Sequence, residues 1–169
     1  MTRKISIESV ANAVLIVVCS WTAFVLYTLP SRAPVTAPAG YRQGDAISLT
    51  DVSLTQSEST VLLFLRSTCT FCTQSMPFYS TLTREIRASK KAGRIRVVVV
   101  TTDDRSIATE YLASHAVSVD EIVPETAPPQ KVTGTPTIVL ATRGGIVQKA
   151  WTGRLDDSRE RELRKELGL

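Results

Sequence analysis

The longest apolar stretch of the chain lies near its N-terminus, where the 20 residues Val10–Leu29 carry no charge. Folded as a helix, this run would rise about 30 Å, which matches the hydrocarbon core of a bilayer. The apolar core of a cleaved signal peptide is shorter, typically about 7–15 residues. We therefore expect residues 1–9 to form an N-terminal tail and residues 10–29 to form a transmembrane anchor.

Two alternatives for this segment stay open. A cleaved signal peptide would use the faint small-residue site Ala37-Pro38-Ala39, although this site lies well beyond the apolar run. A lipoprotein would be cut before Cys19, although the bulky Val18 in front of that cysteine suits such a site poorly.

The charges beside the apolar run bear on its orientation. Arg3 and Lys4 precede the run, and Arg32 and Arg42 follow it, so the positive-inside count is close to a tie. The basic start resembles the beginning of a secretory signal. We expect a single pass through the cell membrane, with residues 1–9 in the cytoplasm and the C-terminal domain on the extracytoplasmic, periplasmic side. Such a compartment is oxidising.

The pattern changes after the run. Prolines and glycines with few apolar residues occupy residues 30–44, which predicts a semi-extended linker. Residues 45–169 are then sufficient to bury one core. In this part, β-branched apolar runs alternate with segments of helical spacing, which predicts an α/β fold with a parallel sheet element covered on both faces.

The individual elements of this domain follow from local patterns. The predicted strands are Ile47–Leu49, Val61–Arg66, Ile95–Thr101, Val119–Val123, Thr137–Ala141 and Ile146–Trp151. The segment Arg143-Gly144-Gly145 joins the last two strands and is typical of a hairpin. The predicted helices are Cys69–Lys91, Ser106–His115 and Asp156–Leu167.

Charge and composition narrow the functional classes. The net charge is only +4, and the basic residues between Arg84 and Arg96 are best explained as a solvated helix face. No aromatic interleaving or nucleic-acid motif accompanies them, so we expect no binding to DNA or RNA. The low cysteine count argues against a scaffold built from disulfides.

The segment Cys69-Thr70-Phe71-Cys72 carries the strongest chemical signal. Two thiols at this spacing can pass between dithiol and disulfide with little backbone movement, and the start of a helix favours a thiolate. Their order makes Cys69 the exposed thiol of low pKa and Cys72 the shielded one. A structural disulfide and half of a zinc site are the alternatives, but beyond the apolar run only His115 could join the two cysteines, whereas structural zinc needs four ligands.

Together with Thr135-Pro136 ahead of the late hairpin, this layout resembles the thioredoxin-like superfamily, and in particular the TlpA/ResA-like membrane-anchored thiol–disulfide oxidoreductases. The resemblance covers about Gly44–Leu169 and implies an α/β sandwich with a central mixed sheet. Cys69 matches the attacking cysteine and Cys72 the resolving one. Two prolines also match: Pro77 the proline that kinks the active-site helix, and Pro136 the cis-proline beside the dithiol.

The resemblance also implies how the site would work. It needs no metal or organic cofactor, and it exchanges disulfides with protein substrates and with an upstream membrane or periplasmic redox partner. We expect a monomer. The backbone of Thr135 beside Pro136 would present itself to an extended substrate. Phe71 is expected to be exposed for substrate contact, and Phe78 to face the core.

Three positions depart from the family pattern and leave the direction of electron flow open. Thr68 stands where the family commonly has Trp, and Thr70-Phe71 replaces the Gly-Pro type of intervening pair. Leu63 occupies the position of the buried acidic residue that helps to deprotonate the second thiol in thioredoxins.

Two other functions occur on the same fold and remain as alternatives. Peroxiredoxins place Pro and Thr before their nucleophile, where this chain has Leu62 and Arg66 before Cys69. Thioredoxin-fold copper chaperones use a cysteine pair that is one residue longer, with a distant histidine for which only His115 is available. Both patterns fit less well than thiol–disulfide exchange.

Overall fold

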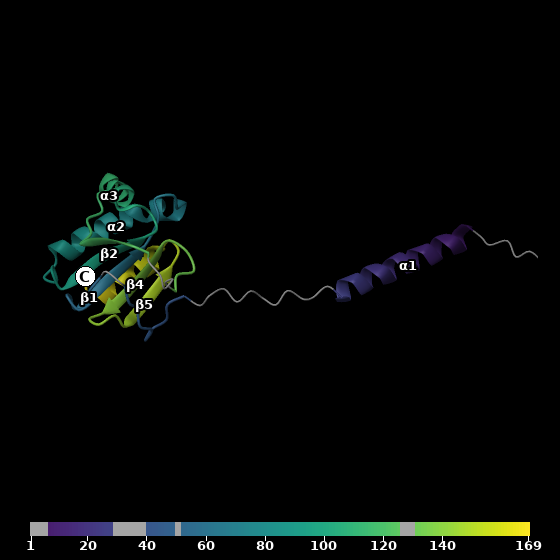
Figure 1. The fold of residues 1–169 in the computed structure, drawn as a ribbon, viewed down its shortest axis with the longest axis horizontal. Coiled ribbons are helices and arrows are strands. Elements are labelled where there is room, and N and C mark those ends of the chain that lie inside the picture. The colour runs from purple at the N-terminus through teal and green to yellow at the C-terminus, as the bar shows by residue number, and fades with distance from the viewer. Residues whose placement is uncertain (1–6, 29–39, 50–51, 126–130) are drawn as a thin grey trace, which may run out of the picture. The chain divides into compact units, whose positions relative to one another are not determined.

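The computed structural model of the chain describes residues 7–28, 40–49, 52–125 and 131–169. It divides into two units: helix α1 (Ile7–Thr28) belongs to the first, and all other helices and strands belong to the second (Figure 1). Most of the linker predicted over residues 30–44 lies outside the described residues.

Helix α1 lies where the uncharged run predicts a helix, since it begins at Ile7 and ends at Thr28. Among the residues described, no helix combines the length and the apolarity that a membrane crossing requires. The expectation of a helix is met.

The second unit is built on one five-stranded mixed sheet. Its strands are β1 (Ser59–Phe64), β2 (Ile95–Thr101), β3 (Glu121–Pro124), β4 (Thr137–Thr142) and β5 (Val147–Thr152), in the spatial order β3-β2-β1-β4-β5. The pairs β1–β2 and β2–β3 are parallel, because helices α2 (Thr70–Ala88) and α3 (Arg105–Ser114) connect them. The pairs β1–β4 and β4–β5 are antiparallel.

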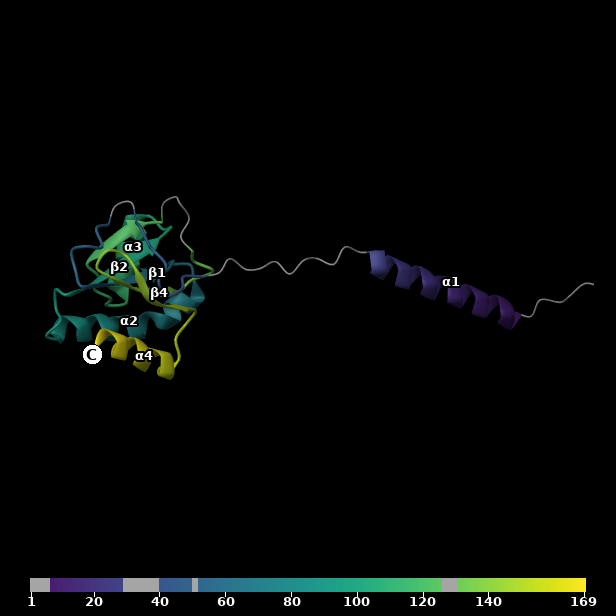
Figure 2. The same cartoon turned by 90° about the horizontal axis from the view of Figure 1, so that it is seen from below.

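The residues of each strand alternate between two buried clusters, one on each face of the sheet. Val61 and Leu63 of β1 face the first cluster, which also contains apolar side chains of α2, α3 and α4 (Asp157–Leu167). Figure 2 shows α2 and α4 next to each other, and an ion pair of 2.8 Å between Arg164 and Glu85 joins them. The active-site helix is therefore held by the sheet and by a neighbouring helix.

The sequence pattern predicts cover on both faces of the sheet, and the cover of the second face differs in kind from that of the first. Leu62 and Phe64 of β1 contact a second cluster, which is completed by Ile47, Leu49 and other side chains of the chain before β1. The strand predicted at Ile47–Leu49 is not formed, and only isolated bridges such as Ala46 to Ile146 occur there. An irregular segment rather than a helix therefore covers this face in the residues described.

Local hydrogen bonds explain two further differences from the predicted boundaries. Strand β3 begins at Glu121 rather than at Val119, because the Asp120 carboxylate accepts the Val97 N–H at 2.7 Å in place of a backbone carbonyl. Helix α2 ends at Ala88 rather than near Lys91, because Ser89 adopts an extended conformation and its hydroxyl donates to the carbonyl of Ile86 at 2.7 Å.

Candidate active site

The two cysteines lie at the junction between β1 and α2. The Cys69 N–H donates to the carbonyl of Arg66 at 3.2 Å, which closes a turn after the strand. Cys69 is then the N-cap of α2, and its sulfur accepts the backbone N–H of Cys72 at 3.2 Å. The sequence therefore places one thiol where a helix offers unsatisfied N–H donors and the second thiol one turn further in.

The two thiols differ sharply in their surroundings. Cys69 is partly exposed, whereas Cys72 is fully buried, and no disulfide joins them. Burial alone would raise the pKa of Cys69, but hydrogen bonds from Cys72, Thr135 and the backbone of Phe71 outweigh it and lower the pKa. Burial, together with the neighbouring Cys69, raises the pKa of Cys72 to about 12. Near neutral pH, Cys69 is thus the nucleophile and Cys72 a protonated thiol.

The loop that precedes β4 lies against the dithiol. The peptide bond between Thr135 and Pro136 is cis, as the resemblance implies. The Cys69 thiol contacts the carbonyl oxygen of Thr135 at 3.3 Å. The loop is fixed from both sides, because the Thr137 hydroxyl donates to the carbonyl of Gly134 at 2.7 Å and the Gly153 N–H donates to the carbonyl of Pro136 at 2.8 Å.

The aromatic residues of α2 separate as their spacing predicts. Phe71, between the two cysteines, is 60% exposed, whereas Phe78 is 8% exposed. The Phe78 ring also lies 5.0 Å from the guanidinium of Arg164. Pro77 lies inside α2, where it has no N–H to donate to the carbonyl of Thr73. Phe71 is therefore the large apolar side chain that the site presents to solvent beside its nucleophile.

Sequence reasoning missed three residues that contact the active-site turn: Thr73, Asp103 and Tyr111. The Asp103 carboxylate accepts the N–H of Ser67 at 2.6 Å, and the Tyr111 hydroxyl lies 3.0 Å from that of Thr73. Asp103 had a usable signal, because it follows β2 at the carboxyl end of a strand that neighbours β1. Tyr111 had none, because its helical spacing predicts only a residue packed on the core.

A hollow of about 270 Å³ adjoins the proline loop. Its lining includes Arg66, Val132, Gly134 and Thr135, so it adjoins the loop whose Thr135 carbonyl contacts the Cys69 thiol. Arg66 and Glu125, which also line it, face each other at 4.0 Å. This hollow offers room beside the proline loop for residues of an extended substrate.

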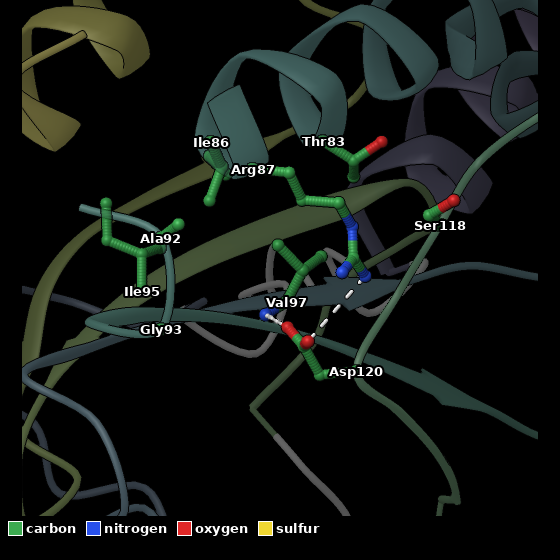
Figure 3. A pocket seen from close by; sticks show the side chains of 9 residues that line it. All are labelled: Thr83, Ile86, Arg87, Ala92, Gly93, Ile95, Val97, Ser118 and Asp120. Atoms are coloured by element: carbon green, nitrogen blue, oxygen red, sulfur yellow. Dashed lines mark hydrogen bonds and ion pairs between the residues drawn. The ribbon is translucent and has the colours of Figure 1, made fainter. Parts of the chain in front are cut away.

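A second hollow, of about 200 Å³, lies at the other end of α2 (Figure 3). Arg87 reaches across it toward Asp120, at 3.7 Å, and Asp120 in turn accepts the N–H of Val97. The charged groups of this hollow thus pair with each other, and we assign the chemistry to the dithiol instead.

The lone histidine takes part in local structure. The Nδ1 atom of His115 lies 2.8 Å from the carbonyl oxygen of Tyr111, at the end of α3. Within the described ranges, no group of three or more His, Cys, Asp or Glu side chains is arranged to hold a metal ion.

No family model matches the chain, and no curated relative matches it. Solved structures do. A candidate thiol:disulfide interchange protein DsbE from Chlorobium tepidum is 26% identical, with a TM-score of 0.54 over 68% of this chain and 79% of that one. StoA from Bacillus subtilis is 18% identical, with a TM-score of 0.50 over 76% of this chain and 96% of its own. A thiol-disulfide isomerase from Corynebacterium glutamicum is 14% identical, with a TM-score of 0.50 over 80% and 96%.

The mixed sheet, the dithiol at the start of α2 and these structural likenesses place the chain in the thioredoxin-like superfamily. Two of these similar structures are named as a thiol:disulfide interchange protein and a thiol-disulfide isomerase.

Proposed function

We propose that this protein exchanges disulfides with protein substrates through Cys69 and Cys72. One observation carries the proposal: the partly exposed Cys69 sulfur caps α2 and accepts the N–H of Cys72, whereas the Cys72 thiol one turn away is fully buried. These surroundings lower the pKa of Cys69 and raise that of Cys72. This asymmetry gives one sulfur the role of attacking a partner and the other the role of releasing it.

The reaction proceeds in two exchanges. The Cys69 thiolate attacks one sulfur of a substrate disulfide, a mixed disulfide forms, and the other substrate sulfur leaves as a thiolate that takes up a proton. Cys72 then loses its proton and attacks the Cys69 sulfur. The internal disulfide forms, and the first substrate sulfur leaves as a thiol. Two electrons have passed to the substrate, and a dithiol protein must supply two electrons to restore the reduced state.

Substrate binding is assigned to the surface around the nucleophile. The Thr135 backbone lies beside the sulfur of Cys69, and the hollow lined by Arg66, Val132 and Gly134 adjoins the same loop. The exposed Phe71 ring, two residues after the nucleophile, provides apolar contact. An extended peptide with a disulfide can pair with the loop backbone while its apolar side chains contact the ring.

Trapping tests this assignment. A Cys72→Ser variant cannot resolve the mixed disulfide, so it should retain substrates covalently on Cys69, and a Cys69→Ser variant should retain none. The same chain should catalyse the reduction of insulin disulfides by dithiothreitol. Absence of both activities in folded, reduced protein would refute the proposal, and turnover of peroxide at a higher rate than of insulin would favour the peroxiredoxin alternative.

We also propose that the domain is attached to the cell membrane and faces the extracytoplasmic side. The uncharged run of residues 10–29 supports attachment, and the five side chains Val14–Val18 of α1 are 57% to 67% exposed, so they offer an apolar surface for a bilayer. The reactive dithiol suits an oxidising compartment.

Fractionation and labelling test this second proposal. The full chain should stay with the membrane fraction after carbonate washing, whereas a chain that begins at Gly40 should not. A membrane-impermeant maleimide added to intact, reduced cells should label Cys69. Labelling only after lysis would overturn the orientation, and a soluble full-length chain would overturn the attachment.

A further inference from the structure

The segment that follows β2 contacts the active-site turn on both sides of the dithiol. Asp103 accepts the N–H of Ser67, two residues before Cys69, at 2.6 Å. The Tyr111 hydroxyl lies 3.0 Å from the hydroxyl of Thr73, four residues after Cys69. One stretch of chain thus holds the residues before and after the nucleophile.

The direction of the hydroxyl contact follows from its surroundings. The Thr73 hydroxyl donates to the carbonyl oxygen of Cys69 at 3.4 Å. A hydroxyl has only one proton to donate, so when Thr73 donates to the Cys69 carbonyl, Tyr111 is the donor to Thr73. The order is therefore Tyr111 to Thr73 to the Cys69 carbonyl, which also accepts the Thr73 N–H at 3.1 Å. This chain of hydrogen bonds links α3 to the first turn of α2.

Asp103 is itself fixed by the sheet. Its N–H donates to the hydroxyl of Thr101 at 3.1 Å, and Thr101 is the buried last residue of β2. Asp103 accepts a hydrogen bond from the Ser67 N–H. Ser67 lies in the turn that is closed by the hydrogen bond from the Cys69 N–H to the Arg66 carbonyl. A hydrogen bond to a carboxylate is stronger than one between neutral groups. The contact therefore connects the end of β2 to the turn that carries the nucleophile.

We propose that Tyr111 and Asp103 are positioning residues that hold this turn so that the N–H of Cys72 points at the sulfur of Cys69. The proposal rests on the function proposed above, because it takes Cys69 as the nucleophile. Neither residue touches a reacting atom in the contacts described. Each acts through the backbone, Tyr111 by way of Thr73 and Asp103 by way of Ser67.

The titration of Cys69 gives a test that is independent of turnover. In a Cys19→Ser, Cys72→Ser background, the rate of alkylation by iodoacetamide follows the Cys69 thiolate. Tyr111→Phe removes only the hydroxyl, and Thr73→Val removes its acceptor. Each change should move the pH midpoint upward by about 0.5 unit, which lowers the thiolate fraction by up to about threefold at a pH below the midpoint.

Matched variants separate positioning from general stability. Thr81→Val removes the same kind of hydrogen bond on the same helix, from the Thr81 hydroxyl to the Pro77 carbonyl, and should leave the midpoint unchanged. Thr73→Ser should restore it. Asp103→Asn and Asp103→Ala both remove the charge, but only Asn keeps an acceptor oxygen. A higher midpoint in Asp103→Ala than in Asp103→Asn therefore reports the hydrogen bond alone.

The outcomes decide the inference in either direction. If Tyr111→Phe and Thr73→Val both fold, as seen by circular dichroism, and both keep the parent midpoint, the positioning role is wrong. If Tyr111→Phe does not fold, the pair Thr73→Val and Thr73→Ser decides. If wild-type protein fails to reduce insulin while the midpoints shift as expected, the proposed function fails and the positioning role stands.

Discussion

The sulfur of Cys69 and the backbone nitrogen of Cys72 lie 3.2 Å apart, so the resolving cysteine also stabilises the attacking one. Its amide donates to the thiolate, while its own thiol lies buried behind it. The first turn of α2 thus serves both cysteines, because it gives one sulfur a donor and keeps water from the other.

This relationship predicts a large difference in reactivity. In a Cys19→Ser background, Cys72→Ser should be alkylated at Cys69 near neutral pH, because the pKa of Cys69 is lowered. Cys69→Ser should react far more slowly, because burial raises the pKa of Cys72 to about 12 and shields its sulfur. Rates of iodoacetamide labelling between pH 5 and pH 10, read by mass spectrometry, check this. Faster labelling of Cys72 at pH 7 would reverse the assigned roles.

The buried thiol also predicts how stability depends on pH. Cys72 keeps its proton in the folded state up to about pH 12, but the unfolded chain loses it near pH 8.5. The unfolded state therefore binds fewer protons above pH 8.5, so reduced protein loses stability as the pH rises through this window, by up to about 1.4 kcal/mol per pH unit from this group. Urea unfolding under reducing conditions, at pH 8 and pH 10, measures the loss.

A variant isolates this effect from other groups that titrate at high pH. Cys72→Ser has no thiol at this position, so its stability should fall less than that of the wild type over the same interval. The stability of Cys69→Ser should fall more steeply than that of the wild type. The pKa of Cys69 is lower in the folded state than in the unfolded chain, so the Cys69 thiolate contributes stability above the unfolded pKa, and the variant lacks this contribution. Equal slopes in all three proteins would show that the thiols do not differ as the structure indicates.

The local pattern of apolar and polar residues is sufficient to predict most helices and strands of the second unit. Strand β2 was predicted at the observed residues, Ile95–Thr101, because a run of β-branched residues has few other stable arrangements. The dithiol was also identified from spacing alone. The cover over the other sheet face was not, because Ile47 and Leu49 are buried there by an irregular segment that has no period to detect.

Contacts between distant residues explain the other differences. The start of β3 depends on a hydrogen bond between Asp120 and Val97, and Tyr111 reaches the site only because α3 packs beside α2. The sequence shows each of these residues but not its partner. The irregular cover lies against the turn between β4 and β5, where Gly145 has φ +82° and a side chain would clash with the carbonyl oxygen of Ile47.

The β5–α4 contact predicts an unequal effect of two neighbouring acids. Glu162 accepts the indole N–H of the buried Trp151 at 2.8 Å and pairs with Lys149 at 2.7 Å. Glu166 pairs only with Lys149, at 3.3 Å, among the contacts described. Glu162→Ala should therefore lower the melting temperature clearly more than Glu166→Ala, because it leaves a buried donor unpaired. Equal shifts, measured by circular dichroism, would mean that the indole contact adds nothing.

The two phenylalanines of α2 should have different roles: replacing Phe78 should lower stability, whereas replacing Phe71 should lower activity on protein disulfides. Phe78 is 8% exposed, so Phe78→Ala should cost about 3–5 kcal/mol in free energy of unfolding. Phe71 is 60% exposed, so Phe71→Ala should leave stability nearly unchanged.

If Phe71 contacts substrate, the same change should raise the KM for a protein disulfide. The rate with a small disulfide, such as that of a dithionitrobenzoate reagent, should stay the same. Phe71→Leu should restore part of the protein activity, because it returns apolar surface. An unchanged KM in Phe71→Ala would remove Phe71 from the proposed substrate surface.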